Sequence, residues 1–152
     1  MNNFIVFLFV IAICFGLSEA CAESRVVFTN EIGKGIIFHV KCQSWNPAIN
    51  HPQINIQPGR NHIFRFVSAE ERTRYDCNVF YQLPVDPNNL PANPNNTRPQ
   101  ENHYNDLEAF RAGTRSNKCA QYREWCARHD GIYFKRHPNE PLGHVLNWTT
   151  KT

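Results

Sequence analysis

The chain has 152 residues, and its 16 lysine and arginine residues exceed its 13 aspartate and glutamate residues, for a formal net charge of +3. A chain of this length makes one ordinary domain with a real core, which argues against a two-domain organisation. Its basic residues form no dense cluster and match no nucleic-acid-binding motif, so we expect no nucleic-acid partner.

An apolar run from Phe4 to Leu17 begins the chain and is followed by small residues over 18–22. This pattern predicts a cleavable secretory signal peptide, which covers residues 1–22 if cleavage follows Ala22; a cut after Ala20 also fits. The run is shorter than the roughly 20 apolar residues that a membrane span needs, so we expect no stable membrane insertion. The predicted product is secreted and extracellular, with a single domain over residues 23–152.

Alternating apolar and polar residues predict a series of β-strands in the first half of the mature chain. A Pro58-Gly59 turn between the third and the fourth of them predicts that these two strands pair as a hairpin. Cys42 and Cys77 fall on the apolar faces of their strands, so we expect disulfide bonds inside or beside the core. The expected strands cover residues 24–30, 36–42, 53–57, 62–67 and 74–83.

Residues 84–102 form a segment with five prolines, six asparagines and almost no apolar side chain. Such a composition predicts a long exposed loop, because proline cannot donate to a strand ladder and little apolar surface is available to bury. Long loops of this kind often carry function, although a tolerated insertion is the alternative. The candidate recognition residues are Asp86, Asn88, Asn89, Asn93, Asn95, Asn96 and Arg98.

Further strands are expected after this loop, over residues 103–112, 132–134 and 145–148. Residues 119–127 are compatible with a short helix or a strand, and the Asp130-Gly131 step that follows favours a strand leading into a hairpin. Together these elements predict an all-β domain, a small antiparallel β-sandwich of about seven or eight strands that is stapled by disulfide bonds.

Cysteine counting supports two disulfide bonds. Cleavage after Ala22 leaves an even set of four cysteines in an oxidising compartment, and the sequence does not choose among their three pairings. These half-cystines are Cys42, Cys77, Cys119 and Cys126. A zinc site is the alternative, but it lacks a C-x-x-C pair and needs free thiolates outside the cell; its ligands would be Cys119, Cys126, His129 and His137. We therefore expect neither a metal nor a cofactor.

Two glycosylation sequons, at Asn95 and Asn147, occur in this predicted extracellular chain. A surplus of basic residues is also found toward the C-terminus. It could contact an acidic receptor, an anionic polysaccharide or lipid headgroups, or it could form a solvated face that aids solubility. The basic residues are Arg111, Arg115, Lys118, Arg123, Arg128, Lys135 and Arg136.

The mature chain contains no G-x-S-x-G, H-E-x-x-H, glycine-rich phosphate-binding or EF-hand motif. Its histidines and carboxylates could still act as general acids and bases after folding, as a secreted ribonuclease would require. We expect ordinary surface histidines instead, and therefore no enzyme. The residues concerned are His39, His62, His103, His129, Asp106, Glu108 and Asp130.

Five segments spread over the mature chain resemble motifs of a known family, although K-C-Q-S differs from the family's H-C-K-S at its first and third positions. They are V-V-F-T-N at 26–30, K-C-Q-S at 41–44, a Pro-Gly turn leading to F-x-F at 64–66, Y-D-C-N-V-F at 75–80 and W-x-A-R-x-D-G-I-Y at 125–133. With these motifs the chain resembles the plant self-incompatibility S1 family, the S-protein homologues. It diverges where Cys126 directly follows Trp125, since family members usually carry that cysteine two residues before the tryptophan.

This resemblance implies a small secreted β-sandwich with two disulfide bonds, no cofactor and no known catalysis, which acts as a protein ligand for a cell-surface receptor. A hydrophilic loop is implicated in recognition by the self-incompatibility members, and by analogy residues 84–102 are the candidate recognition surface. Two alternatives remain: a secreted defence or effector protein that acts through its basic surface, and a small secreted hydrolase such as a ribonuclease. The sequence does not indicate an oligomeric state.

Overall fold

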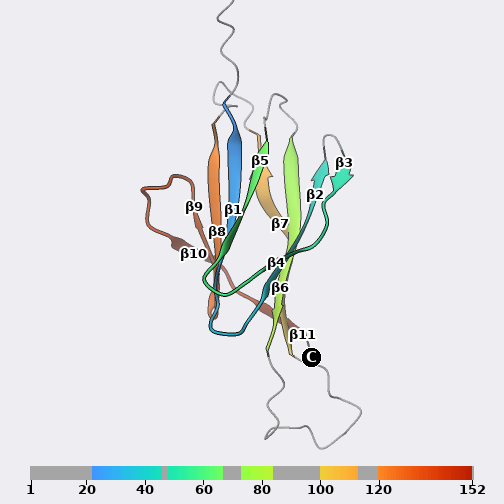
Figure 1. Cartoon of the computed structure of the whole chain (residues 1–152), viewed down its shortest axis with the longest axis vertical. Coiled ribbons are helices and arrows are strands. Elements are labelled where there is room, and N and C mark those ends of the chain that lie inside the picture. The colour runs from blue at the N-terminus through green and yellow to red at the C-terminus, as the bar shows by residue number, and fades with distance from the viewer. Residues whose placement is uncertain (1–21, 46–47, 67–72, 84–99, 113–119, 152) are drawn as a thin grey trace, which may run out of the picture.

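A computed structural model describes residues 22–45, 48–66, 73–83, 100–112 and 120–151 (Figure 1). The predicted leader, apart from Ala22, lies outside these ranges. Within them the chain forms eleven strands and no helix, more strands than the seven or eight expected. The strands are β1 (Ser24–Glu31), β2 (Phe38–Trp45), β3 (Ala48–Asn50), β4 (Ile54–Ile56), β5 (Asn61–Phe66), β6 (Arg74–Gln82), β7 (Glu101–Arg111), β8 (Tyr122–Arg128), β9 (Gly131–Lys135), β10 (Gly143–Leu146) and β11 (Thr149–Lys151). The short strands β3 and β11, of three residues each, match no expected range.

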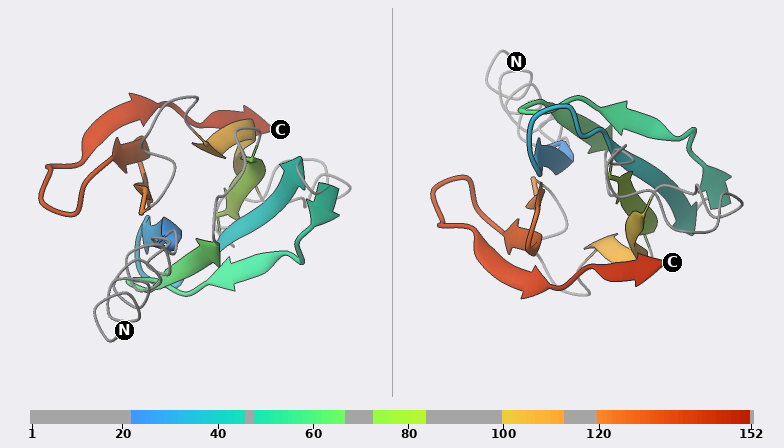
Figure 2. Two further views of the ribbon diagram at one scale, coloured as in Figure 1. Left: turned by 90° about the horizontal axis from the view of Figure 1, so that it is seen from above. Right: turned by 90° about the horizontal axis from the view of Figure 1, so that it is seen from below.

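The strands form two sheets that face each other, which confirms the all-β sandwich. A five-stranded sheet has the order β10-β9-β8-β1-β5, and a six-stranded sheet has the order β11-β7-β6-β2-β3, with β4 also paired to β2. Figure 2 looks along the strands and shows the two layers, with β8 and β1 opposite β7, β6 and β2. The strand pairs of the described residues are antiparallel except for β1 and β8, which run parallel with Phe28 opposite Trp125.

The core lies between the layers and is built from the inward residues of both sheets. In β2 the residues alternate between buried and more exposed, which places Phe38 and Val40 inside as the sequence pattern predicts. The ring of Phe28 from the facing sheet lies 6.4 Å from that of Phe38 and 6.0 Å from that of Phe64, measured between ring centroids. Tilted and edge-on contacts of this kind add to the hydrophobic stabilisation that burial supplies.

A buried asparagine holds the lower ends of β1 and β4 together. Asn30, with no exposed surface, donates from Nδ2 to the carbonyls of Ile36 (2.9 Å) and Ile56 (2.8 Å) and accepts from the Ile32 amide (3.1 Å). Two backbone groups between β1 and β2, and one at the end of β4, thereby gain partners. The asparagine that ends the V-V-F-T-N motif is therefore a structural clamp.

The expected hairpin of β4 with β5 is wrong. β4 pairs with β2 in one sheet, whereas β5 pairs with β1 in the other. Gly59 lies in the left-handed region (φ 69°), and its amide donates to the Asn30 carbonyl (2.8 Å), so the turn packs against the end of β1 and sends the chain across to the opposite sheet.

The C-terminal part confirms a strand over most of 119–127 and a hairpin after it. The turn lies one residue earlier than the Asp130-Gly131 step: Arg128 pairs with Gly131, so His129 and Asp130 form the turn. Of the closing edge strand expected over 145–148, only Val145 and Leu146 lie in a strand, the edge strand β10, and the chain then crosses to the other sheet and forms β11. β10 pairs with β9, and β11 pairs with β7. Between them, Trp148 packs on Tyr81 at 5.1 Å between ring centroids and donates from Nε1 to the Arg128 carbonyl (2.7 Å), so this crossing closes one end of the sandwich.

Candidate functional site

The predicted recognition residues, Asp86 to Arg98, lie outside the described residues, but both ends of their segment are described. Gln82 of β6 pairs with Glu101 of β7, and the Leu83 amide donates to the Gln100 carbonyl (3.0 Å). Residues 101 and 102, which the sequence assigned to the loop, belong to β7. Pairing with β6 on one side and β11 on the other supplies their hydrogen bonds, which composition did not reveal.

One disulfide bond joins Cys42 and Cys77, directly opposite each other in β2 and β6 with their Cα atoms 4.0 Å apart. Both are buried, as the inward positions predict. Cys126 differs from the expected half-cystine: it is a buried free thiol in β8, and Cys119 lies outside the described residues. Cys126 lies opposite Thr29 of β1 and Tyr133 of β9, so neither neighbouring strand offers it a cysteine.

The Cys126 thiol is also protonated at ordinary pH. Burial, together with the hydrogen bond to Glu31 and its charge, raises the pKa of Cys126 to about 12. Since the thiolate is the nucleophile and the metal ligand, this environment disfavours either role. Within the described ranges no group of three or more His, Cys, Asp and Glu side chains could hold a metal ion.

Of the two sequons, the one at Asn147 lies within the described residues. Asn147 is exposed between β10 and β11, and Thr149, the third residue of its sequon, is exposed as well. The neighbouring Trp148 is partly buried, but the acceptor asparagine is not. Asn95 lies outside the described residues, and glycosylation at either position stays a prediction.

The structure does not pair the candidate catalytic histidines with the candidate carboxylates among the described residues. His39 stacks on Phe80 at 4.6 Å between ring centroids and bonds to Asn55, while burial lowers the pKa of His62. In the described part of the chain, the one histidine–carboxylate contact is between His137 and Glu140 (3.9 Å), both largely exposed. The candidate carboxylates have other partners: Glu108 pairs with arginines, and Asp130 accepts from a tyrosine hydroxyl.

Some of the basic residues of the predicted C-terminal surplus form ion pairs and others do not. Arg115 and Lys118 lie outside the described residues. Three of the other five pair with carboxylates, as Arg111–Glu108, Arg128–Glu31 (2.8 Å) and Lys135–Glu124 (3.0 Å). The guanidinium groups of Arg123 and Arg136 have no carboxylate partner among the described residues, so these are the two unpaired charges of the five described basic residues.

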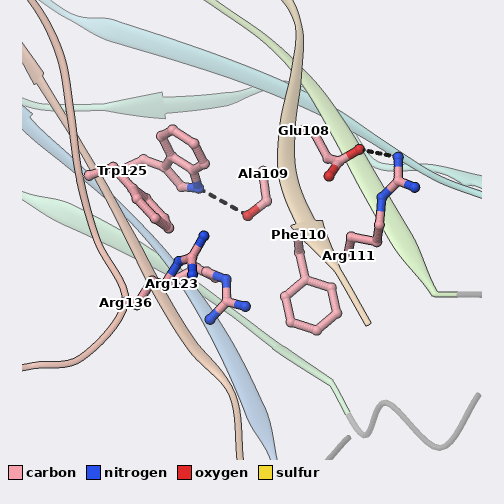
Figure 3. Close-up of a pocket in the computed structure, with 8 residues that line it drawn as sticks. Glu108, Ala109, Phe110, Arg111, Arg123, Trp125 and Arg136 are labelled. Atoms are coloured by element: carbon pink, nitrogen blue, oxygen red, sulfur yellow. Dashed lines mark hydrogen bonds and ion pairs between the residues drawn. The ribbon is translucent and has the colours of Figure 1, made fainter. Parts of the chain in front are cut away.

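Both arginines line a cavity of about 290 Å³ between β7 of one sheet and the β8–β9 hairpin of the other (Figure 3). The hairpin register explains why they meet. Trp125 lies opposite Phe134, and two residues farther from the turn Arg123 and Arg136 occupy the same face. Glu124 and Lys135 pair on the other face of the hairpin.

Aromatic side chains form the inner wall of this cavity. The rings of Trp125 and Phe134 are 4.3 Å apart between centroids, and the Trp125 indole donates to the Ala109 carbonyl of β7 (3.0 Å), which ties the two sheets together. Phe110, Glu108 and Arg111 complete the β7 side. The cavity thus combines an apolar wall with two guanidinium groups, a combination that suits an anion carried on an apolar body.

Sequence reasoning noted these arginines only as part of a basic surplus. A more specific signal was present: R-x-W at 123–125 and F-x-R at 134–136 are placed symmetrically about the His129-Asp130 turn. A hairpin at that turn puts all four side chains on one face. The sequence does not indicate that residues of β7 also line the cavity, because β7 belongs to the other sheet.

A second hollow, of about 210 Å³, lies on the outer face of β2 and β6. Trp45, 57% exposed, donates from Nε1 to the Asp76 carboxylate (2.6 Å), and Arg74 binds the same carboxylate. Its Asp76 carboxylate is therefore already engaged by two donors.

Comparison with known proteins gives a consistent result. Residues 25–148 match the family described as plant self-incompatibility protein S1. S-protein homolog 25 of Arabidopsis thaliana is 32% identical over 97% of this chain and 98% of its own, and S-protein homolog 30 of the same plant is 33% identical over 89% and 94%. A solved structure described as "SPH (Self-Incompatibility Protein Homologue) proteins, a widespread family of small, highly stable, secreted proteins from plants" shares the fold, with a TM-score of 0.57 and 24% identity over 86% of this chain and 98% of that chain.

Proposed function

This chain belongs to the plant self-incompatibility protein S1 family, and from that premise we propose that it acts outside the cell as a recognition ligand for a cell-surface receptor protein. The observation that carries the proposal is the family match itself, which extends over residues 25–148 and so includes nearly all of the sandwich. Residues within the matched range hold the fold together: Asn30 binds the Ile36 and Ile56 carbonyls, Cys42 and Cys77 form the disulfide bond, and Trp125 bridges the sheets.

A receptor ligand benefits from a rigid body that presents irregular segments, because a rigid body limits the entropy lost on binding. Here β6 and β7 pair as far as Gln82 and Glu101, and the Leu83–Gln100 hydrogen bond extends that pairing by one step. The hydrophilic segment 84–99 therefore leaves and rejoins the sandwich at one place. This anchoring supports residues 84–99 as the receptor-contacting segment.

The test uses the complete secreted protein, fluorescently labelled, and intact plant protoplasts. We expect saturable surface binding that unlabelled protein competes away and that protease treatment of the cell surface abolishes. One variant replaces residues 84–99 with a Gly/Ser segment of equal length. A matched control replaces residues 137–142, the exposed β9–β10 connection, in the same way.

Loss of binding in the first variant only, with unchanged melting temperatures, supports the proposal. Binding that never saturates, or that survives protease treatment, contradicts a receptor protein. Equal loss of binding in both variants contradicts the assignment to residues 84–99.

A further inference from the structure

The cavity between β7 and the β8–β9 hairpin has features that the receptor role does not require. Its two unpaired arginines lie close enough to affect each other: burial, and then the positive charge of Arg136, lower the pKa of Arg123. Two like charges held together in a partly buried place are unfavourable unless an anion offsets them. Figure 3 shows both guanidinium groups between the rings of Trp125 and Phe110.

The local hydrogen bonds fix one arginine and leave the other available. Arg123 donates to the Tyr122 carbonyl (2.9 Å) and to Oε1 of Gln121 (3.1 Å), which uses two of its five N–H donors and holds the group in place. Arg136 is exposed, and no hydrogen bond of its guanidinium group to a described residue is present. One arginine is therefore preorganised, and the other is free to close on a ligand.

The acidic residue of the cavity does not neutralise these charges. Glu108 is engaged by Arg111, and Arg74 approaches the same carboxylate at 3.6 Å. The guanidinium groups of Arg123 and Arg136 consequently lie beside an aromatic wall without an ion-pair partner among the described residues. Arginine recognises oxyanions through paired N–H donors, and aromatic rings accept an apolar body by stacking.

We propose that this cavity binds a small organic oxyanion, whose phosphate, sulfate or carboxylate group lies between Arg123 and Arg136 and whose apolar body packs on Trp125 and Phe134. A volume of about 290 Å³ suits one aromatic or short aliphatic group, near the lower end of the range for ligand sites. The anion comes from a free metabolite or from an acidic side chain of a partner. The proposal does not depend on residues 84–99 or on a receptor.

Binding is measured by titrating the full-length mature protein with phenyl phosphate and following the Trp125 indole N–H resonance by NMR, assigned with Trp125→Phe. We expect saturable binding that weakens as salt is added. Arg136→Gln should lower the affinity at least about tenfold, because it removes a charge-assisted contact. Arg136→Lys should restore part of the loss. Arg60→Gln removes an exposed arginine elsewhere and should change the affinity less than about twofold.

Three probes separate the parts of the proposal. Benzyl alcohol lacks the charge, and inorganic phosphate lacks the apolar body; both should bind at least about tenfold more weakly than phenyl phosphate. N-acetylphosphotyrosine amide presents the same group from a peptide backbone. Its binding supports a partner side chain as the source, whereas binding of phenyl phosphate alone supports a free metabolite.

The proposal is overturned if no anion saturates, if benzyl alcohol binds equally well, or if Arg136→Gln and Arg60→Gln have the same effect. Because Arg136 is exposed, its replacement is not expected to unfold the protein, and an unchanged melting temperature verifies this. Protoplast binding is a separate readout, so failure here leaves the receptor proposal standing.

Discussion

Replacing Asn30 should cost more stability than replacing any exposed asparagine. Asn30→Ala removes three hydrogen bonds, to the Ile36 and Ile56 carbonyls and from the Ile32 amide. At about 1 kcal/mol for each bond, the loss is about 3 kcal/mol. The groups at Ile32 and Ile56 are buried and lose their partner without access to water, so this figure is closer to a minimum than a maximum.

Asn30→Asp adds a dependence on pH. The new carboxyl group keeps its acceptor toward Ile32 but faces two carbonyl oxygens in a site without solvent, so its folded-state pKa lies above the unfolded value of about 3.9. The folded state favours the protonated carboxyl group. The stability that this protonation contributes is therefore complete below the unfolded pKa and is lost as pH rises through the folded-state pKa. The cost of the substitution should therefore grow by about 1.4 kcal/mol for each pH unit between the two values.

Guanidinium unfolding followed by tryptophan fluorescence at pH 4 and pH 8 measures both effects, with the disulfide bond kept oxidised. Asn61→Asp, in the exposed first position of β5, is the matched control and should be nearly neutral at both pH values. A loss below about 1 kcal/mol for Asn30→Ala would refute the clamp. A cost of Asn30→Asp that is the same at pH 4 and pH 8 would refute the buried carboxyl.

Three further predictions concern packing, the disulfide bond and a tyrosine. Gly131→Ala should cost about 1–3 kcal/mol in thermal unfolding, because the added Cβ would lie 2.5 Å from a β10 carbonyl; an unchanged melting temperature would contradict that close approach. Replacing Cys42 and Cys77 by alanine should cost about 4 kcal/mol, since they are 35 residues apart in sequence, and a loss under about 1 kcal/mol would show that the bond constrains little. Burial and then Glu124 raise the pKa of Tyr122 to about 12, so its stabilising contribution is complete below about pH 10 and is lost toward pH 12. Absorbance at 295 nm should show this late titration, and Tyr122→Phe should remove it.

Local patterns identified most elements correctly. The alternation over 36–42 and 74–83 predicted β2 and β6, and it placed Cys42 and Cys77 on inward faces that the disulfide bond now joins. The Asp130-Gly131 step predicted the β8–β9 hairpin. These inferences succeed because side chains alternate with a period of two along any strand, whichever strand it pairs with.

Pairing partners were harder to predict. β4 and β5 are separated by a turn, which indicates a hairpin, yet they belong to different sheets because the turn packs on Asn30. The parallel contact of β1 with β8 joins segments about a hundred residues apart, as Phe28 opposite Trp125 illustrates. Such contacts depend on the burial available in the whole molecule, which no local pattern records.

The amino-acid sequence by itself determined where most strands lie, which of their faces point inward, that a hairpin joins β8 and β9, and which family the chain resembles. Each of these depends on neighbours within a few residues or on a short motif. Only the tertiary structure decided which strands pair and that β7 closes a cavity over Arg123 and Arg136. The physical reason is that a cavity between two sheets needs side chains from both, and the approach of the sheets follows from packing the whole core.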